Sequence, residues 1–248
     1  MTLALVGTGQ MGQAVAALAP DRGHTIAARF NTDRPLTDAA PAALAGVDAV
    51  IDFSLPDVAL AHLKRYARWQ VPAVMGTTGW YDARATVHDW FTAHDGTLLY
   101  AANFSLGIAV LRRALAGALP LLNALPDYDA FVHETHHNQK VDSPSGTAEM
   151  LAEDVLAALD RKTHATPEAQ HERIDPAALH VSSTRVGTTF GEHTVGFDGA
   201  HDRLELSHRA KGRTGFAFGA LRCAEWVQGR TGVFTLDDVL DDWLAPTD

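Results

Sequence analysis

Short apolar runs alternate with amphipathic segments through the first hundred residues. Five of these runs have the length of buried strands, and they lie at 3–6, 25–28, 47–53, 71–75 and 97–100. Three segments between them place apolar residues at helical spacing, from 10 to about 19, at 57–69 and at 81–94. Strands that alternate with helices form βαβ units, so the pattern predicts an α/β, Rossmann-like domain with a parallel sheet between two helical layers.

The pattern changes after about residue 106. A long helix is predicted to about residue 125, followed by a strand at 128–134. Three further segments alternate apolar and polar residues, as half-buried strands do, and they lie at 179–186, 192–197 and 203–208. Helices are predicted at 216–227 and 236–244, and the polar segment 161–176 is predicted to be an exposed loop. This part of the chain is therefore expected to be α+β, with a mixed or antiparallel sheet.

Bulk properties narrow the possible ligands. The formal net charge of −10 argues against general binding to nucleic acid or to anionic membranes. Cys223 is the only cysteine, which excludes an intramolecular disulfide and a cysteine-rich metal site. No apolar run looks long enough to span a bilayer, and the N-terminus enters a strand without a basic leader. We expect a cytoplasmic protein with a small-molecule ligand and no bound metal.

A glycine-rich loop follows the first predicted strand and opens the first helix. It reads Gly7-Thr8-Gly9-Gln10-Met11-Gly12. In this position the first glycine permits a tight turn, the second lets a pyrophosphate approach the backbone, and the third lets the helix pack on the strand. The alternative is a tight turn without a ligand, but the βα context favours a dinucleotide site.

The end of the second strand bears on the choice of cofactor. An acidic residue there would bind the adenosine ribose and favour NADH. The local sequence offers no acid at the strand end, and instead Arg29 and Arg34 could meet the 2′-phosphate of NADPH. Both arginines could equally be solvated, so NADH and NADPH both stay open.

Two further strand ends carry small and polar residues. Gly76, Thr77 and Thr78 follow the fourth strand, and Ala101, Ala102, Asn103 and Phe104 follow the fifth. Ligands of open α/β sheets bind outside the carboxyl ends of the strands. Small residues leave room for a nicotinamide ring there, and the Asn or Thr side chains could bind its carboxamide. On their own these segments would be ordinary strand–loop junctions.

The segment from Glu134 to Ala148 concentrates proton-active side chains before a predicted helix entrance. His136 and His137 point to opposite sides of an extended chain, so they cannot readily share one metal. Helix start signals follow at Ser143, Pro144, Ser145 and Gly146, since Pro suits the first turn and Ser can cap free amides. The free N–H groups and positive dipole end of that helix favour an anion. An imidazole near neutral pH can donate a proton, and Lys140 suits a carboxylate. We expect a site for a small carboxylate that undergoes acid-assisted chemistry.

Together these motifs resemble the 4-hydroxy-tetrahydrodipicolinate reductase family, also called dihydrodipicolinate reductase. The segment from Glu134 to Ala148 is close to the family signature E-x-H-H-x-x-K-x-D-x-P-S-G-T-A. Matching segments elsewhere are Asp52-Phe53-Ser54, Gly76 to Gly79, Ala101 to Gly107, Gly191 to Val195 and His208 to Ala220. The resemblance covers nearly the whole chain.

The resemblance implies an activity and a division of roles. The family reduces a cyclic diacid on the diaminopimelate route to lysine, with NADH or NADPH as hydride donor. His136 would then be the proton donor and Lys140 the second catalytic residue, with His137, Ser145, Gly146 and Thr147 on the substrate. The cofactor would be held by the glycine loop, Arg29 and the two strand-end segments.

The resemblance also implies the domains: residues 1–107 and 214–248 form the dinucleotide-binding domain, and 108–213 bind substrate and assemble a homotetramer. Hydride would come from one domain and the proton from the other. The alternatives are another Rossmann-type reductase, such as an aspartate dehydrogenase-like enzyme, and a nucleotide-binding sensor without turnover. The proton-active set around His136 favours an enzyme.

Overall fold

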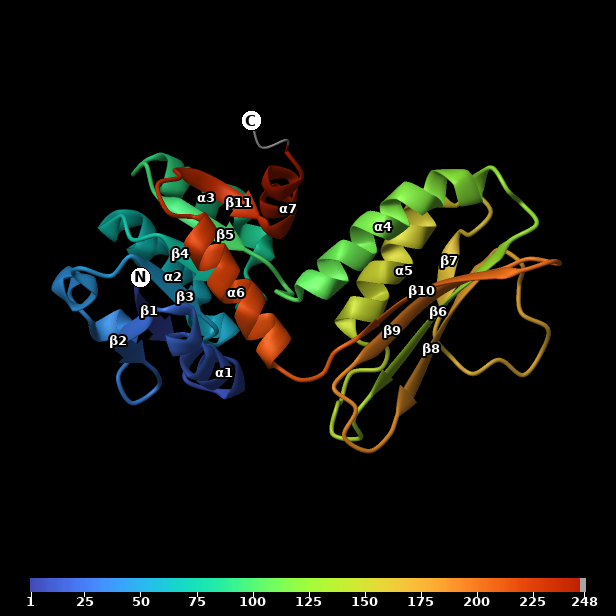
Figure 1. Ribbon diagram of the computed structural model, residues 1–248, viewed down its shortest axis with the longest axis horizontal. Coiled ribbons are helices and arrows are strands. Elements are labelled where there is room, and N and C mark those ends of the chain that lie inside the picture. The colour runs from blue at the N-terminus through green and yellow to red at the C-terminus, as the bar shows by residue number, and fades with distance from the viewer. Residues whose placement is uncertain (246–248) are drawn as a thin grey trace. The chain divides into compact units, whose positions relative to one another are not determined.

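Residues 1–245 are described by a computed structural model, in which the chain divides into two units (Figure 1). Unit 1 contains Met1–Leu106 together with the described chain from Arg213 onwards, and unit 2 is Gly107–Gly212. Residues 246–248, which were assigned to the dinucleotide-binding domain, lie outside the described residues.

Unit 1 is built on a six-stranded parallel sheet, which confirms the predicted fold class. Its strand order is β11-β5-β4-β3-β1-β2, and every ladder is parallel. The strands are β1 Thr2–Val6, β2 Thr25–Phe30, β3 Ala49–Asp52, β4 Ala73–Met75, β5 Thr97–Tyr100 and β11 Gly232–Thr235. The edge strand β11 was not predicted, because its four residues are all half-buried and show no alternation.

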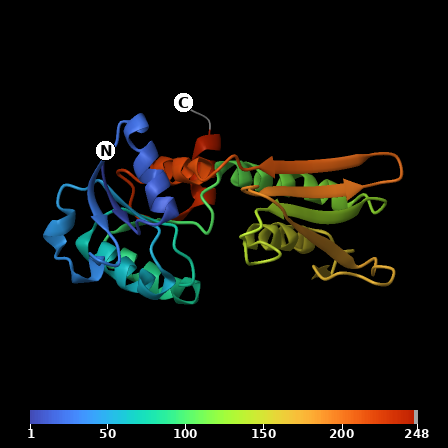
Figure 2. The same cartoon turned by 90° about the horizontal axis from the view of Figure 1, so that it is seen from below.

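Helices cover both faces of this sheet, as Figure 2 shows. Alternate strand residues point to opposite faces, so Leu3 and Leu5 enter one core while Ala4 and Val6 enter the other. The first core is covered by α1 Gln10–Leu18, α6 Thr214–Trp226 and α7 Leu236–Leu244, and the second by α2 Pro56–Trp69 and α3 Arg84–Thr92. Short 3-10 turns occur at Pro20–Arg22, Leu36–Asp38, Pro41–Leu44 and Tyr81–Ala83.

Unit 2 is built on a five-stranded mixed sheet of order β10-β9-β6-β8-β7. Its strands are β6 Asp129–His136, β7 His164–Thr166, β8 Ala178–Arg185, β9 Glu192–Asp198 and β10 Arg203–Arg209. The β6–β8 and β7–β8 ladders are parallel, and the β6–β9 and β9–β10 ladders are antiparallel. The chain crosses over through α5 between β6 and β7, and residues 167–177 connect β7 to β8 without a helix. The prediction of a loop at 161–176 missed β7.

Two helices, α4 Leu106–Asn123 and α5 Gly146–Ala158, pack on the same face of this sheet (Figure 1). The predicted stripe of α5 is confirmed, and its members are Ala148, Leu151, Ala152, Val155 and Leu159, each at most 3% exposed. By length and composition alone α4 could cross a membrane, with a mean hydropathy of 1.3, so the sequence prediction that no such run exists was wrong. Its Leu111, Leu115 and Leu119 enter the core of unit 2, and core helices meet the same test.

Candidate active site

The glycine-rich loop of unit 1 has the close packing that its sequence predicts. Gly7 has a positive φ of 86°, which disfavours any other residue. A Cβ atom on Gly12 would lie 2.0 Å from the carbonyl oxygen of Gly7, whereas a Cβ on Gly9 would meet no atom within 4 Å. Gly12 therefore permits helix α1 to approach the loop, and Gly9 faces open space. This is the arrangement that a pyrophosphate-binding loop requires.

Two cavities adjoin the loop. One, of about 290 Å³, extends from Gly7, Thr8 and Gly9 to the residues that follow β2. The other, of about 340 Å³, is lined by Gly9, Gln10, Met11, Phe53, Ser54, Pro56, Gly76, Thr77 and Thr78. The structure thus brings the glycine loop and the segment after β4 together, as the sequence predicted. The residues that line the second cavity do not include Ala101, Ala102, Asn103 or Phe104.

The segment after β5 is instead tied into the fold of unit 1. Phe104 is buried, and its ring meets that of Phe53 edge-on with centroids 5.9 Å apart. A Cβ on Gly219 of α6 would lie 1.9 Å from the Phe104 carbonyl oxygen, so the helix packs directly on this backbone. Asn103 accepts a hydrogen bond from the Ser105 backbone at 2.7 Å.

A buried carboxylate at the end of β3 orders the cavity walls. Asp52 is fully buried and accepts hydrogen bonds from Tyr66 at 2.6 Å and from His62 at 3.0 Å. Its other oxygen accepts from the Ser54 backbone at 2.8 Å and from the Thr77 hydroxyl at 3.3 Å. His62 also lines the first cavity. Sequence reasoning matched Asp52 to the family without giving it this role, and it missed His62.

The two arginines considered for cofactor choice lie differently. Arg29 is an exposed residue within β2 and is not among the residues that line the first cavity. The guanidinium of Arg34 lies 5.1 Å from the centroid of the Phe30 ring, and Phe30 lines that cavity. Asn31 holds this turn, because its side-chain oxygen accepts from the backbone of Arg34 at 2.9 Å. Arg34 is therefore the cation nearer to the cavity wall.

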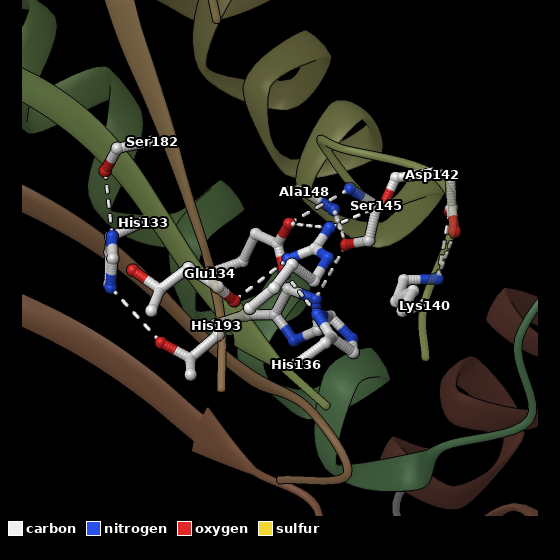
Figure 3. A network of polar contacts seen from close by, with 12 residues as sticks. His133, Glu134, His136, Lys140, Asp142, Ser145, Ala148, Ser182 and His193 are labelled. Carbon is white, nitrogen blue, oxygen red and sulfur yellow. Dashed lines mark hydrogen bonds and ion pairs between the residues drawn. The ribbon is translucent and has the colours of Figure 1, made fainter. Parts of the chain in front are cut away.

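The catalytic candidates of unit 2 lie at the end of β6. Along the strand, alternate residues face the helices: Val132 contributes to the apolar core, and Glu134 and His136 continue the same face. Glu134 is fully buried and His136 is 7% exposed. The register places His193 of β9 opposite Glu134 and Arg185 of β8 beside His136. The apolar face of the sheet therefore ends in a polar cluster where α5 begins (Figure 3).

Glu134 is at the centre of this cluster. Its Oε2 accepts a short hydrogen bond from Nδ1 of His136. Its Oε1 accepts from Nη2 of Arg185 at 2.8 Å and from the Ser145 backbone at 3.3 Å. Burial raises the pKa of the Glu134 carboxyl, but the interactions with Arg185, Ser183 and His136 outweigh it, so the net pKa lies below its usual value. Glu134 is an ionised carboxylate at neutral pH.

Opposing effects act on His136. Burial lowers its pKa, the hydrogen bond and charge of Glu134 raise it, and the charges of Lys140 and Arg185 lower it again. The net pKa lies below the ordinary imidazole value. A Cβ on Gly191 would lie 2.8 Å from Nε2 of His136, so only glycine allows the chain to pass beside this nitrogen. Since Nδ1 is bound to Glu134, Nε2 is the nitrogen available for chemistry.

A third imidazole, His193, packs edge-on against His136 with ring centroids 5.1 Å apart. Burial, followed by the charge of His136, lowers the pKa of His193 to about 4, so it is neutral at physiological pH. Its Nε2 lies 3.2 Å from the Ser145 hydroxyl, which caps α5 by accepting from the Ala148 backbone. The predicted helix start is confirmed, with Ser145 as the N-cap that His193 helps to hold. Pro144 precedes the cap, so the prediction that it lies in the first turn was wrong.

The predicted lysine is held beside the same helix entrance. Nζ of Lys140 donates to the carboxylate of Asp142 at 2.8–2.9 Å. Burial raises the pKa of Asp142, but Lys140 and the backbone N–H of Gly146 lower it to a value below the usual one. Gly146 is exposed and Thr147 half-buried at the first turn of α5. Nδ1 of His137 is buried and has no hydrogen-bond partner among the described residues.

Glu134, His136 and His193 also have donor atoms within 4.8 Å of one another, the spacing that a metal ion would need. The positive guanidinium of Arg185 already lies on the Glu134 carboxylate, and both carboxylate oxygens accept hydrogen bonds. A second cation there would be repelled. The contacts favour a proton-transfer site.

Sequence reasoning did not assign roles to Glu134, Arg185 or His193. The period of two in a strand could have placed Glu134 beside His136. Arg185 and His193 join the site only through the register of β8 and β9 on β6, which no single-strand pattern reveals.

Family models and related sequences point to the same protein family. Residues 1–104 match the family described as "Dihydrodipicolinate reductase, N-terminus", and residues 107–240 match "Dihydrodipicolinate reductase, C-terminus". A 4-hydroxy-tetrahydrodipicolinate reductase of Christiangramia forsetii is 36% identical, over 98% of each chain. One from Neisseria meningitidis serogroup C is also 36% identical, over 90% of this chain and 83% of that protein.

A solved structure shares the fold. It is a dipicolinate-bound dihydrodipicolinate reductase from Paenisporosarcina sp. TG-14, with a TM-score of 0.78 over 95% of this chain and 97% of that one. The two sequences are 19% identical, so this likeness concerns the fold.

The loop geometry leads to a test with a matched pair of variants. Gly12→Ala places a methyl group against the Gly7 carbonyl and is expected to cost about 1–3 kcal/mol of unfolding free energy. Gly9→Ala has open space and should unfold like the wild type, yet weaken NADH and NADPH binding roughly tenfold, because a pyrophosphate approaches there. Thermal unfolding and fluorescence titration measure the two effects. Undiminished binding by Gly9→Ala would contradict a role for this loop in cofactor binding.

Proposed function

The chain belongs to the dihydrodipicolinate reductase family, and we propose how its own residues carry out the reaction of that family. The protein is an NAD(P)H-dependent oxidoreductase that reduces 4-hydroxy-tetrahydrodipicolinate to tetrahydrodipicolinate on the diaminopimelate route to lysine. The net reaction adds a hydride and a proton and releases water. When bound, NADH or NADPH supplies the hydride.

Unit 1 is the dinucleotide-binding domain of this proposal. Gly7 to Gly12 hold the pyrophosphate, since Gly9 leaves open space and the N-terminus of α1 offers free N–H groups. Gly76, Thr77 and Thr78 contribute to the nicotinamide side through the cavity that they share with the loop. Asp52 orders the wall of this cavity by accepting a hydrogen bond from the Thr77 hydroxyl. The family resemblance assigns Ala101, Ala102, Asn103 and Phe104 to the nicotinamide side as well, although they do not line this cavity.

Unit 2 supplies the proton. The observation that supports this role is the buried pair of Glu134 and His136 at the entrance of α5. Protonated His136 donates from Nε2, while Nδ1 stays bound to the Glu134 carboxylate. The imidazolium that donates is stabilised by that carboxylate, and the neutral ring left behind takes a proton back from solvent before the next turnover.

The substrate is a small diacid, and its carboxylates are held at the start of α5. Ser145, Gly146 and Thr147 present the first helical turn, whose dipole favours an anion. Lys140 provides a cation at the same place, where Asp142 holds its ammonium group. His137 lies next along the chain to His136 and contacts the substrate. Lys140 also serves as the second catalytic residue.

Assembly of a homotetramer through the sheet of unit 2 belongs to the same proposal. Among the described residues both helices of this unit pack on one face, and the opposite face carries half-buried side chains, including Phe131, His133 and Thr135. Half-buried apolar and neutral polar groups on an open sheet face suit burial against another copy. Light scattering should give four times the 26.6 kDa chain mass. A monomer at micromolar concentration would contradict this assembly.

The activity is tested by coupling the purified protein to a synthase that makes the hydroxy-diacid and following the loss of NADH or NADPH absorbance. His136→Gln should lower kcat by roughly 10²–10⁴-fold, the contribution of a general acid, and leave the Kd of the cofactor unchanged. His164→Gln, at an exposed position of β7, is the matched control and should retain wild-type kcat. Failure of the wild type to oxidise either cofactor would reject the reductase function, and equal losses of kcat and cofactor binding would make His136 structural.

Cofactor choice is tested with two arginine variants. Arg34→Ala should raise the KM for NADPH roughly tenfold and leave the KM for NADH nearly unchanged, because a guanidinium binds a 2′-phosphate through charge-assisted hydrogen bonds. Both arginines are exposed, but Arg34 lies over the ring of Phe30, which lines the cavity, so Arg29→Ala should have a smaller effect. An unchanged ratio of the two KM values in both variants would remove these arginines from cofactor selection.

A further inference from the structure

We propose that Glu134 is a positioning residue that keeps His136 protonated at Nδ1, so that Nε2 is the nitrogen that gives up the proton. The inference rests on the proton-donor role of His136 proposed above. It adds a residue that does not touch the substrate but acts through the imidazole, and Arg185 is the group that anchors it.

Toward His136, Glu134 can act only as a hydrogen-bond acceptor for Nδ1. Glu134 is fully buried, and its two oxygens have separate partners. Oε2 accepts from Nδ1 of His136, as Figure 3 shows, while Oε1 accepts from Nη2 of Arg185 and from the backbone N–H of Ser145. Ser183, the neighbour of Glu134 on β8, also lowers the pKa of the carboxyl. A carboxylate can only accept, so Nδ1 must carry a proton in both the neutral and the charged ring. The reactive proton is thereby confined to Nε2.

Arg185 fixes the direction of the carboxylate. The same guanidinium nitrogen donates to Glu134 and to the backbone carbonyl of Asp142, in the loop that also carries Lys140. Because Arg185 and Ser145 both donate to the oxygen on their side, they hold the plane of the carboxylate with its other oxygen towards His136. Glu134 therefore presents Oε2 to His136 in one orientation.

An amide at this position would reverse the tautomer. In Glu134→Gln the donors Arg185 and Ser145 require the amide oxygen on their side, so the NH₂ group must face Nδ1 of His136. Nδ1 then becomes an acceptor, and the proton of the neutral ring moves to Nε2. Protonating that ring would place two donors, Nδ1–H and the NH₂ group, against each other. The variant thus keeps the size of the side chain but removes the proton-donating form of His136.

The charged and titratable groups that face His136 set the direction of the pH effects. They are Glu134 on β6, Lys140 in the following loop, Arg185 on β8 and His193 on β9. Glu134 raises the pKa of His136, whereas Lys140 and Arg185 lower it. Removing the charge of Glu134 must therefore lower that pKa, and removing Arg185 must raise it. Activity that needs protonated His136 is lost as pH rises through this pKa.

The test combines nitrogen-15 NMR of histidine-labelled full-length protein with pH profiles of kcat. The resonance of His136 is identified by its absence in His136→Gln. Wild type should show the Nδ1–H tautomer at high pH, and Glu134→Gln should show Nε2–H. In Glu134→Gln, kcat at neutral pH should fall on the order of 10²-fold, with less than about a threefold change in the substrate KM. The high-pH limb of its kcat profile should move to lower pH.

A second variant distinguishes the proposed role of Glu134 from a loss of activity through misfolding. Arg185→Met leaves both Glu134 and His136 in place, and its high-pH limb should move to higher pH, opposite to that of Glu134→Gln. Asp154→Asn is the matched control, because Asp154 also pairs with an arginine of unit 2, Arg112, but lies in the third turn of α5 and is not among the groups that shift the pKa of His136. The high-pH limb of the kcat profile of Asp154→Asn should stay at the wild-type position.

The outcomes separate this inference from the proposed function. Full activity of His136→Gln would reject the proton-donor role whatever the tautomer. Two results with an inactive His136→Gln would overturn the inference and make Glu134 only structural. In one, Glu134→Gln keeps the Nδ1–H tautomer. In the other, neither Glu134→Gln nor Arg185→Met moves the high-pH limb of the kcat profile. Opposite shifts of the two limbs together with the tautomer reversal would support it.

Discussion

The carboxylate of Glu134 is buried where the apolar face of the unit 2 sheet meets the first turn of α5. An unpaired charge there would cost several kcal/mol, and removing one partner of such a pair typically costs about 3–5 kcal/mol. Three donors offset this cost: His136, Arg185 and the Ser145 backbone. Each belongs to a different structural feature, so one ionised group contacts His136, the neighbouring strand β8 and the helix entrance at once.

Unit 1 also contains a buried carboxylate with several hydrogen-bond donors, in this case beside the cavities of the glycine loop. Asp52 is also fully buried at a strand end, and Tyr66, His62, Thr77 and the Ser54 backbone satisfy it. These contacts order the walls of the cavities beside the glycine loop. In both units a buried carboxylate at or near the end of a strand, Asp52 at the end of β3 and Glu134 two residues before the end of β6, orders the side chains of a site.

Much of this architecture could be predicted from local patterns. The alternation of strands and helices gave the parallel sheet, and the cap at Ser145 and the stripe behind it gave α5, because these features depend on neighbours in sequence. The edge strands β7 and β11 were missed, since they lack the continuous buried apolar run that identified the equally short β3, β4 and β5. Arg185 and His193 escaped notice because strand register alone places them beside His136.

The central claim is that His136, held by Glu134, is the group whose protonation permits turnover. The most direct measurement compares two titrations of the wild-type protein: the NMR shift of the His136 ring against pH, and the pH dependence of kcat/KM. The account predicts that both midpoints coincide, at a pKa below the ordinary imidazole value of 6.5. A His136 midpoint clearly separate from the kinetic one would assign the essential proton to another group and contradict the account.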